Sequence, residues 1–219
     1  MAPRRWLPLL LVPASSACLP APPPAAPSRI AAVAPYAVDA PAEEARHFAI
    51  HPEGSIVEID AVDMVMGPHT LRFTRFRGTL VPEEAGGTGK LTLDVDVREL
   101  HTHRELSTSI IKDELLQVDR FSHARLTLSL RPGRDPDERV AEGGFELHGV
   151  VRGVRFVGTL RRRGERWRFI GGFEASRRAH DIRRTPDLDW MILDEFLVRI
   201  DLLASPEQVT VEMAGGAAR

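Results

Sequence analysis

The chain has 219 residues, of which 43% are hydrophobic and 27% charged, and its formal net charge is −2. This is an ordinary globular composition, and its near-neutral charge argues against a nucleic-acid-binding domain, which is usually clearly basic. The single cysteine, Cys18, excludes an intramolecular disulfide, so hydrophobic burial has to stabilise the fold.

Residues 1–17 have the layout of a secretory signal peptide. Two arginines precede a short apolar run from Trp6 to Val12, and small residues then lead up to Cys18. The apolar run is too short to span a bilayer. The stretch resembles the lipobox of bacterial lipoproteins, which implies that cleavage makes Cys18 the first mature residue and that Cys18 is lipidated. Plain secretion and an incidental cysteine in a leader are the alternatives.

Residues 18–45 continue from the cysteine as a tract rich in proline and alanine. Such a tract favours extended conformations and serves as a spacer, so we expect a tether between a membrane and a folded domain. Leu19 follows Cys18, where lipoproteins retained in the inner membrane often carry aspartate. By this resemblance we expect a periplasmic protein anchored to the cell envelope, with the outer membrane favoured.

From Phe48 onward the apolar residues alternate with polar ones, which is typical of half-buried strands. The clearest example is "KLTLDVDVREL", where Leu91, Leu93 and Val95 share one face. The stretches "ARLTLSL", "GVRFVGTL", "RWRFIGGF" and "EFLVRIDLL" repeat the pattern, and "RRRGER" has the composition of a tight hairpin turn. We therefore expect a folded domain at 46–213 and a disordered tail at 214–219.

One segment has a helical rather than an alternating pattern. Ile111, Leu115 and Val118 recur at i, i+4 and i+7, which predicts one amphipathic helix of about three turns inside 104–119. Many strands, each with one apolar face, and a single helix predict a mainly β fold, an antiparallel β-barrel. We expect the apolar stripe of the helix to cover one opening of that barrel.

Four stretches in order resemble one family. They are "FAIHPEGSIVEI", "TRFRGTL", "STSIIKDELLQVDRFSHARLTL" and "FELHGVVRGVRFVGTL", and the ending "DEFLVRIDLLAS" follows them. Together they resemble the YceI-like domain, a secreted bacterial barrel that is lipocalin-like in shape. The resemblance implies a carrier, because known members hold a polyisoprenoid or another amphiphilic lipid inside the barrel. "RRAHDIRR" departs from the family pattern, so we expect a differently shaped rim there.

A lipid inside the barrel would contact the inward-facing apolar side chains. The ligand-binding residues that we predict on this basis are Leu71, Phe73, Leu93, Val95, Leu128, Phe145, Phe156, Phe169, Phe173 and Val198. The expected function is that of a carrier without chemistry, bound to an isoprenoid-like or fatty lipid and to a membrane through its N-terminus. A surface-exposed interaction protein with a solid barrel is the alternative, and the oligomeric state is left open between monomer and homodimer.

Other kinds of site find little support in the sequence. His101 and His103 would point the same way from a strand, but no further ligand spacing accompanies them, so no metal is expected. No "G-x-S-x-G" elbow is present, so no catalytic residue or cofactor is expected. We expect His148 to form structural hydrogen bonds near a turn.

The arginine groups "RRRGER" and "RRAHDIRR" have two interpretations. They are solvated loop residues, or they attract an anionic lipid head group or a pyrophosphate at a cavity mouth. The second interpretation requires that the arginines cluster in space.

Overall fold

The computed structural model describes residues 46–82 and 88–206. The predicted signal peptide, Cys18, the tether and the tail at 214–219 lie outside the described residues, as does the end of the predicted domain at 207–213. The described strands are β1 (Phe48–Ile50), β2 (Ile56–Asp63), β3 (Gly67–Phe73), β4 (Phe76–Val81), β5 (Gly89–Asp96), β6 (Leu100–His101), β7 (His123–Pro132), β8 (Glu138–Leu147), β9 (Val150–Arg163), β10 (Arg166–Ser176) and β11 (Glu195–Pro206). The helical segments are η1 (Val97–Glu99), α1 (Glu105–Ile110), η2 (Ile111–Leu115), η3 (Arg178–His180) and η4 (Asp189–Met191).

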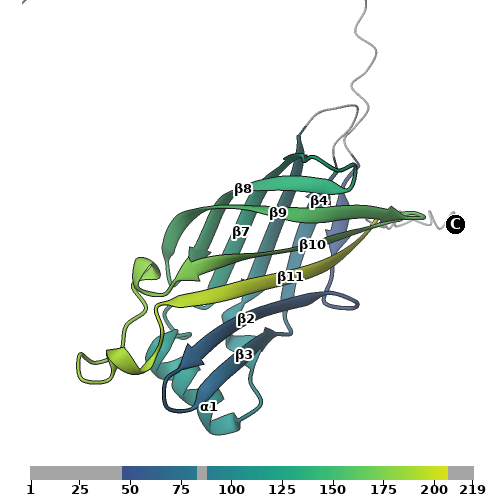
Figure 1. The fold of residues 1–219 in the computed structure, drawn as a ribbon. Helices are drawn as coiled ribbons and strands as arrows, with labels where there is room; N and C mark the ends of the chain where they lie inside the picture. The colour runs from purple at the N-terminus through teal and green to yellow at the C-terminus, as the bar shows by residue number, and fades with distance from the viewer. Residues whose placement is uncertain (1–45, 83–87, 207–219) are drawn as a thin grey trace, which may run out of the picture. The chain divides into compact units, whose positions relative to one another are not determined.

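The strands close into an antiparallel barrel (Figure 1). They follow the order β1-β4-β5-β7-β8-β9-β10-β11, and β1 pairs with both β4 and β11, which completes a ring of eight strands. Closure leaves no long unpaired edge in this ring. The predicted mainly β fold with a closed antiparallel barrel is confirmed.

β2, β3 and β6 lengthen the barrel at one end. β2 continues beside β11, β3 pairs with β2, and the two residues of β6 pair with the end of β3. After His101 the chain leaves the sheet, and α1 and η2 follow before β7 begins. Figure 1 shows α1 beside β3 at this end. The barrel is therefore bounded here by a helix and loops as well as by strands.

The alternation of the sequence gives the barrel its interior. In β7, for example, every second residue from Ala124 to Leu130 is buried, and the residues between them are more exposed. The ten predicted ligand-binding residues are all buried, each with at most 9% of its surface exposed. They belong to one hydrophobic core that fills the barrel.

Two glycines make room for aromatic rings in this core. A Cβ atom at Gly158 would lie 2.7 Å from the ring of Phe169, and one at Gly171 would lie 2.6 Å from the ring of Phe156. Phe156 in turn stacks on Phe173 with 5.2 Å between ring centroids. Because a larger residue at either glycine would displace a ring, the interior around these phenylalanines is closely packed.

The predicted helix is present and lies inside 104–119. It consists of α1 and η2, and η2 has the wider winding of a π-helix. Val118 is buried, and Ile111 and Leu115 are partly buried against the core. Ile111 and Leu115 of the predicted stripe therefore face the barrel from the helix, whereas Val118 packs from the turn that follows it. π-helical turns often occur at functional positions, because they weaken the regular hydrogen-bond ladder.

An acid-sensitive ion pair fixes the junction between β5 and η1. Asp96 accepts hydrogen bonds from Arg98 Nε at 2.9 Å, from its terminal nitrogen at 2.8 Å and from its backbone nitrogen at 3.1 Å. These bonds lower the pKa of Asp96 to about 2. A depressed pKa stabilises the fold above the unfolded-state value near 4, and the contribution is lost as the pH falls towards 2.

We expect Asp96→Asn to destabilise the protein at pH 7 and to lose most of that effect by pH 2. Urea unfolding of both proteins at several pH values measures the difference. An effect of the same size at both pH values would show that the charge of Asp96 is not what stabilises this junction.

Candidate functional site

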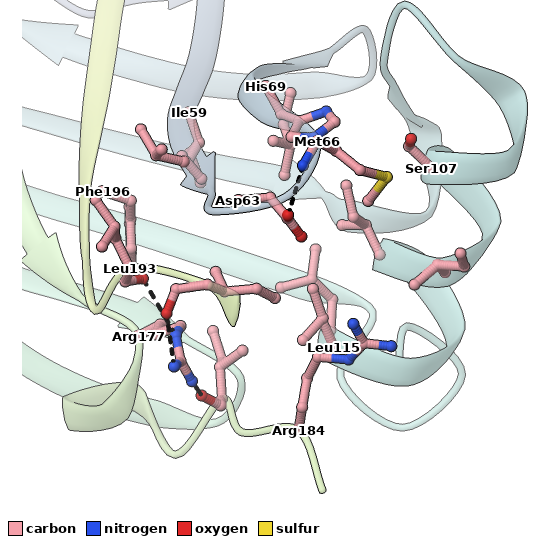
Figure 2. A pocket seen from close by; sticks show the side chains of 18 of the residues that line it. Ile59, Asp63, Met66, His69, Ser107, Leu115, Arg177, Arg184, Leu193 and Phe196 are labelled. Atoms are coloured by element: carbon pink, nitrogen blue, oxygen red, sulfur yellow. Dashed lines mark hydrogen bonds between the residues drawn. The ribbon is translucent and has the colours of Figure 1, made fainter. Parts of the chain in front are cut away.

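A cavity of about 90 Å³ lies at the end of the barrel where β2 ends and β11 begins. Three segments surround it: the β2–β3 hairpin, α1–η2, and the loop that joins β10 to β11. Figure 2 shows side chains from all three segments converging on this space, which we call the mouth cavity. Its apolar lining includes Ile59, Ala61, Leu71, Ile110, Ile111, Leu115, Leu116, Leu147, Ile182, Ile192 and Phe196.

Polar groups are few at this site. The charged or hydrogen-bonding side chains in the lining are Asp63, His69, Ser107, Arg177 and Arg184. A mainly apolar cavity with a few placed polar groups is the usual form of a site for a small amphiphilic molecule.

Asp63 places a carboxylate at the edge of the cavity. The residue is only 6% exposed, and its Oδ1 accepts hydrogen bonds from the backbone nitrogens of Val65 at 2.7 Å and Met66 at 2.8 Å. These bonds hold the hairpin turn closed. The negative charge of Asp63 would repel a phosphate or carboxylate entering beside it.

Arg177 is buried beneath the loop between β10 and β11 and fixes its course. Its side chain is 5% exposed and forms an ion pair with Asp189. Its nitrogens donate to Asp189 Oδ1 and to the backbone carbonyls of Ile182, Asp189, Ile192 and Leu193. Since these five bonds use all five N–H groups of a guanidinium, Arg177 has none left for a ligand. Its role here is to hold the cavity wall in place.

One ion pair links the helix to the loop across the mouth cavity. Arg184 donates to Glu114 Oε2 at 2.9 Å, and Glu114 lies in η2. The carboxylate is 56% exposed, so the pair is worth no more than about 1 kcal/mol. The helix is therefore attached to the loop much more weakly than the loop is attached to the barrel.

His69 in β3 and Ser107 in α1 add hydrogen-bonding groups to the lining of the mouth cavity. Among the described residues no hydrogen-bond partner reaches the buried Nε2 of His69. Ser107 is 4% exposed and lies in α1 across the cavity (Figure 2). A buried ring nitrogen without a partner is costly, and a ligand hydroxyl could satisfy it.

A second, smaller cavity of about 30 Å³ lies deeper in the barrel. Five of the predicted ligand-binding residues line it: Phe73, Leu93, Val95, Phe145 and Val198. Leu71 lines the mouth cavity, whereas Leu128, Phe156, Phe169 and Phe173 line neither. The ten residues thus share one interior, but the sequence pattern did not distinguish those that line a cavity from those in the packed core.

The loop residues of the mouth cavity were not predicted. Ile182, Ile192 and Leu193 come from a segment without strand or helix periodicity, so no pattern indicated that they face the barrel. The predicted helix stripe was the available signal, since Ile111 and Leu115 do line the cavity.

The two arginine groups lie at opposite ends of β10. "RRRGER" forms the β9–β10 hairpin, and "RRAHDIRR" follows the far end of β10 at the mouth cavity. The four arginines of the second group, Arg177, Arg178, Arg183 and Arg184, pair with Asp189, Asp189, Asp181 and Glu114. The two groups therefore do not combine into one cationic site, and each arginine of the second group already has a carboxylate partner.

Among the residues that the structure describes, neither the histidine pair nor His148 forms a metal site. His101 and His103 are exposed, and no group of three or more potential metal ligands occurs in the described part of the chain. His148 occupies a hairpin turn, with φ of 54°, and its ring packs 4.0 Å from that of Phe121. Burial lowers its pKa. Neither ring nitrogen has a hydrogen bond of good geometry within the described residues, although an interaction with the backbone of His180 opposes the lowering, so the hydrogen-bonding role stays a prediction.

Comparison with known proteins identifies the family. The profile of the YceI-like domain matches residues 48–204, which span the barrel from β1 to β11. The chain belongs to the YceI-like family. The predicted family is thereby confirmed, whereas no curated protein is significantly similar to this YceI-like chain.

Solved structures share the fold of this YceI-like barrel. BcnA of Burkholderia cenocepacia superposes with a TM-score of 0.65 at 16% identity, over 71% of this chain and 99% of that one. A polyisoprenoid binding domain from Saccharophagus degradans gives 0.58 at 14% identity, over 73% and 98%. The YceI protein of Campylobacter jejuni gives 0.51 at 12% identity, over 63% and 85%. Within residues 46–82 and 88–206, no helix is long and apolar enough to cross a membrane.

Proposed function

We propose that this YceI-like protein is a carrier of the bacterial envelope that holds one amphiphilic lipid with a prenyl or fatty chain and performs no chemistry on it. The observation that carries the proposal is the mouth cavity, an apolar space with few polar groups at one end of a barrel whose interior is apolar. The family and the polyisoprenoid binding domain with the same fold support it.

The small volume of the two cavities corresponds to a closed form of such a carrier. The mouth cavity and the second, deeper cavity measure about 90 and 30 Å³, whereas ligand pockets usually measure ~300–1,000 Å³. A long chain therefore enters only if one wall moves. The α1–η2 wall is the one to move, because Glu114–Arg184 is a weak link and Arg177 holds the opposite loop.

The polar groups of the mouth cavity favour a neutral head group. Asp63 repels phosphate, and the guanidinium of Arg177 is fully used within the protein. The other cation of the lining, Arg184, is paired with Glu114. The Nε2 of His69 can exchange a hydrogen bond with a hydroxyl. We expect a prenol-like or other uncharged amphiphile rather than a pyrophosphate.

Filling the mouth cavity tests this function. Ala61→Phe should weaken binding of retinol, a fluorescent isoprenoid alcohol, by about tenfold or more, because steric overlap costs on the order of 1–3 kcal/mol. Val157→Phe adds the same ring at an exposed position on the outer wall, 58% exposed, and should leave binding unchanged. Geranylgeraniol should displace retinol better than its pyrophosphate does.

A surface-exposed interaction protein with a ligand-free barrel is the second candidate. The small volume of both cavities favours it. It predicts that the unchanged protein does not bind retinol at all, whereas equal binding by the Ala61→Phe and unchanged proteins would place the ligand elsewhere than the mouth cavity.

The envelope location rests on the N-terminal sequence. If Cys18 is lipidated, Cys18→Ala should move the protein from the membrane to the soluble fraction and abolish its labelling by palmitate. Fractionation of cells after metabolic labelling measures both. Membrane association that survives the substitution would contradict the anchor. The outer membrane as destination and a homodimer remain predictions.

A further inference from the structure

An exposed apolar surface borders the mouth cavity. It is formed by two neighbouring segments, the tip of the β2–β3 hairpin and the η4 region of the loop before β11. We call it the apolar rim, and it consists of Val62, Met64, Val65, Met66, Trp190 and Leu193. Val65, Trp190 and Met64 are 65%, 63% and 60% exposed.

The two segments of the apolar rim are held together. Met64 N donates to Met191 O at 2.6 Å, and Leu193 N donates to Val62 O at 3.0 Å. Between these bonds Asp63 forms a β-bridge with Ile192. The side chains are thus presented on a fixed backbone, and their exposure is built into the fold.

Trp190 is oriented by its own hydrogen bond. Its indole Nε1 donates to the backbone carbonyl of Asp187 at 2.8 Å, while most of the side chain is exposed. A fixed, exposed indole with its N–H already satisfied is suited to the boundary between lipid and water.

We propose that the apolar rim docks on a lipid bilayer surface, so that the mouth cavity opens onto the membrane. Val62, Met66 and Leu193 belong both to the rim and to the cavity lining, so docking would give an apolar molecule a continuous path. Each exposed apolar side chain gains from insertion independently, without a complementary partner shape.

The size of the rim favours lipid over protein. It has six side chains, whereas a stable protein–protein interface uses ~20–30 residues a side. A second copy of the chain or another protein would therefore need surface beyond the rim. A bilayer needs no surface beyond the rim.

The N-terminal segment is long enough to allow this orientation. β1 pairs with the end of β11 at Pro206, whereas the rim adjoins the start of β11, so the folded domain begins at the end away from the rim. β11 has 12 residues and is ~40 Å long. Cys18 and Phe48 are 30 positions apart, and a chain of that length can extend to ~100 Å. An anchored N-terminus therefore permits the opposite end to reach the same membrane.

The charges beside the rim predict how docking responds to salt. Arg178 and Arg183 are exposed but pair with Asp189 and Asp181. Docking should therefore occur on uncharged phosphatidylcholine and depend little on ionic strength, unlike attraction to anionic lipids.

Fluorescence quenching by brominated lipid tests the docking. The full chain is bound to phosphatidylcholine vesicles whose acyl chains carry bromine, and the same is done for Trp190→Phe. We expect quenching of the intrinsic fluorescence, with a component that disappears in Trp190→Phe and is little changed by 0.5 M salt. Val65→Glu should remove the Trp190 component, whereas Val157→Glu, a control at a 58% exposed position on the outer wall, should keep it.

Two outcomes would overturn the docking. One is quenching that is equal in the unchanged protein and Trp190→Phe. The other is a dimer in sedimentation that Val65→Glu dissociates while Trp190 remains unquenched, which would assign the rim to a second copy. Ala61→Phe should weaken retinol binding but keep the quenching, so failure of docking and failure of the carrier function are told apart.

Discussion

Replacing Arg177 by methionine should lower the free energy of unfolding by about 3–5 kcal/mol, because it breaks a buried ion pair and removes five hydrogen bonds whose acceptors are left largely out of water. The side chain is 5% exposed, and its loss would leave four buried or partly buried backbone carbonyls without their donors and the Asp189 carboxylate with only Arg178 and a backbone N–H. Methionine keeps the volume of the stem, so the loss reports hydrogen bonds and charge more than packing.

Arg178→Met is the matched control for this prediction. Arg178 contacts the same Asp189 carboxylate at 3.0 Å, but its side chain is 48% exposed. We expect a loss below about 1 kcal/mol, because exposed ion pairs are largely compensated by water. Urea unfolding of the unchanged protein, Arg177→Met and Arg178→Met measures both losses. Equal losses at both positions would contradict the central role given to Arg177 in holding the loop.

Phe169→Ala should cost about 3–5 kcal/mol of unfolding free energy, since removing a buried ring from a packed core leaves a cavity. Phe169 is 1% exposed and lies against Gly158, at a position where a Cβ would come within 2.7 Å of its ring. The milder Phe169→Leu should cost about 1 kcal/mol.

Retinol binding by Phe169→Leu separates packing from ligand contact. Because Phe169 lines neither cavity, we expect retinol affinity to stay unchanged while stability falls. A shift in affinity with unchanged stability would contradict this and would return Phe169 to the ligand-binding wall that the sequence predicted.

The fold could be predicted because its signals are local. Period-two alternation in stretches such as Leu91–Val95 depends only on which face is buried, and the helical spacing of Ile111 and Leu115 marks the one segment that leaves the sheet. Closure of the barrel followed from the number of such strands and from the family resemblance.

The site could be predicted only in part, because its geometry depends on contacts distant in sequence. Alternation indicates that Phe156 and Phe73 point inward, but not that the first is packed and the second borders a cavity. In the sequence, Arg177 is one of several arginines in a loop. Its role became visible only in the folded loop, where its N–H groups donate to backbone carbonyls. Trp190 carried no periodic signal at all.

The central claim, that the barrel carries a lipid, is tested most directly by mass spectrometry of the protein purified from its native envelope. Denaturing conditions keep acyl chains covalently bound to Cys18, so the difference between native and denatured masses reports only non-covalent cargo. We expect one lipid per chain, uncharged in its head group and prenyl or fatty in its tail, and a smaller fraction of lipid-loaded protein for Ala61→Phe. Native and denatured masses that coincide for the unchanged protein would contradict the carrier.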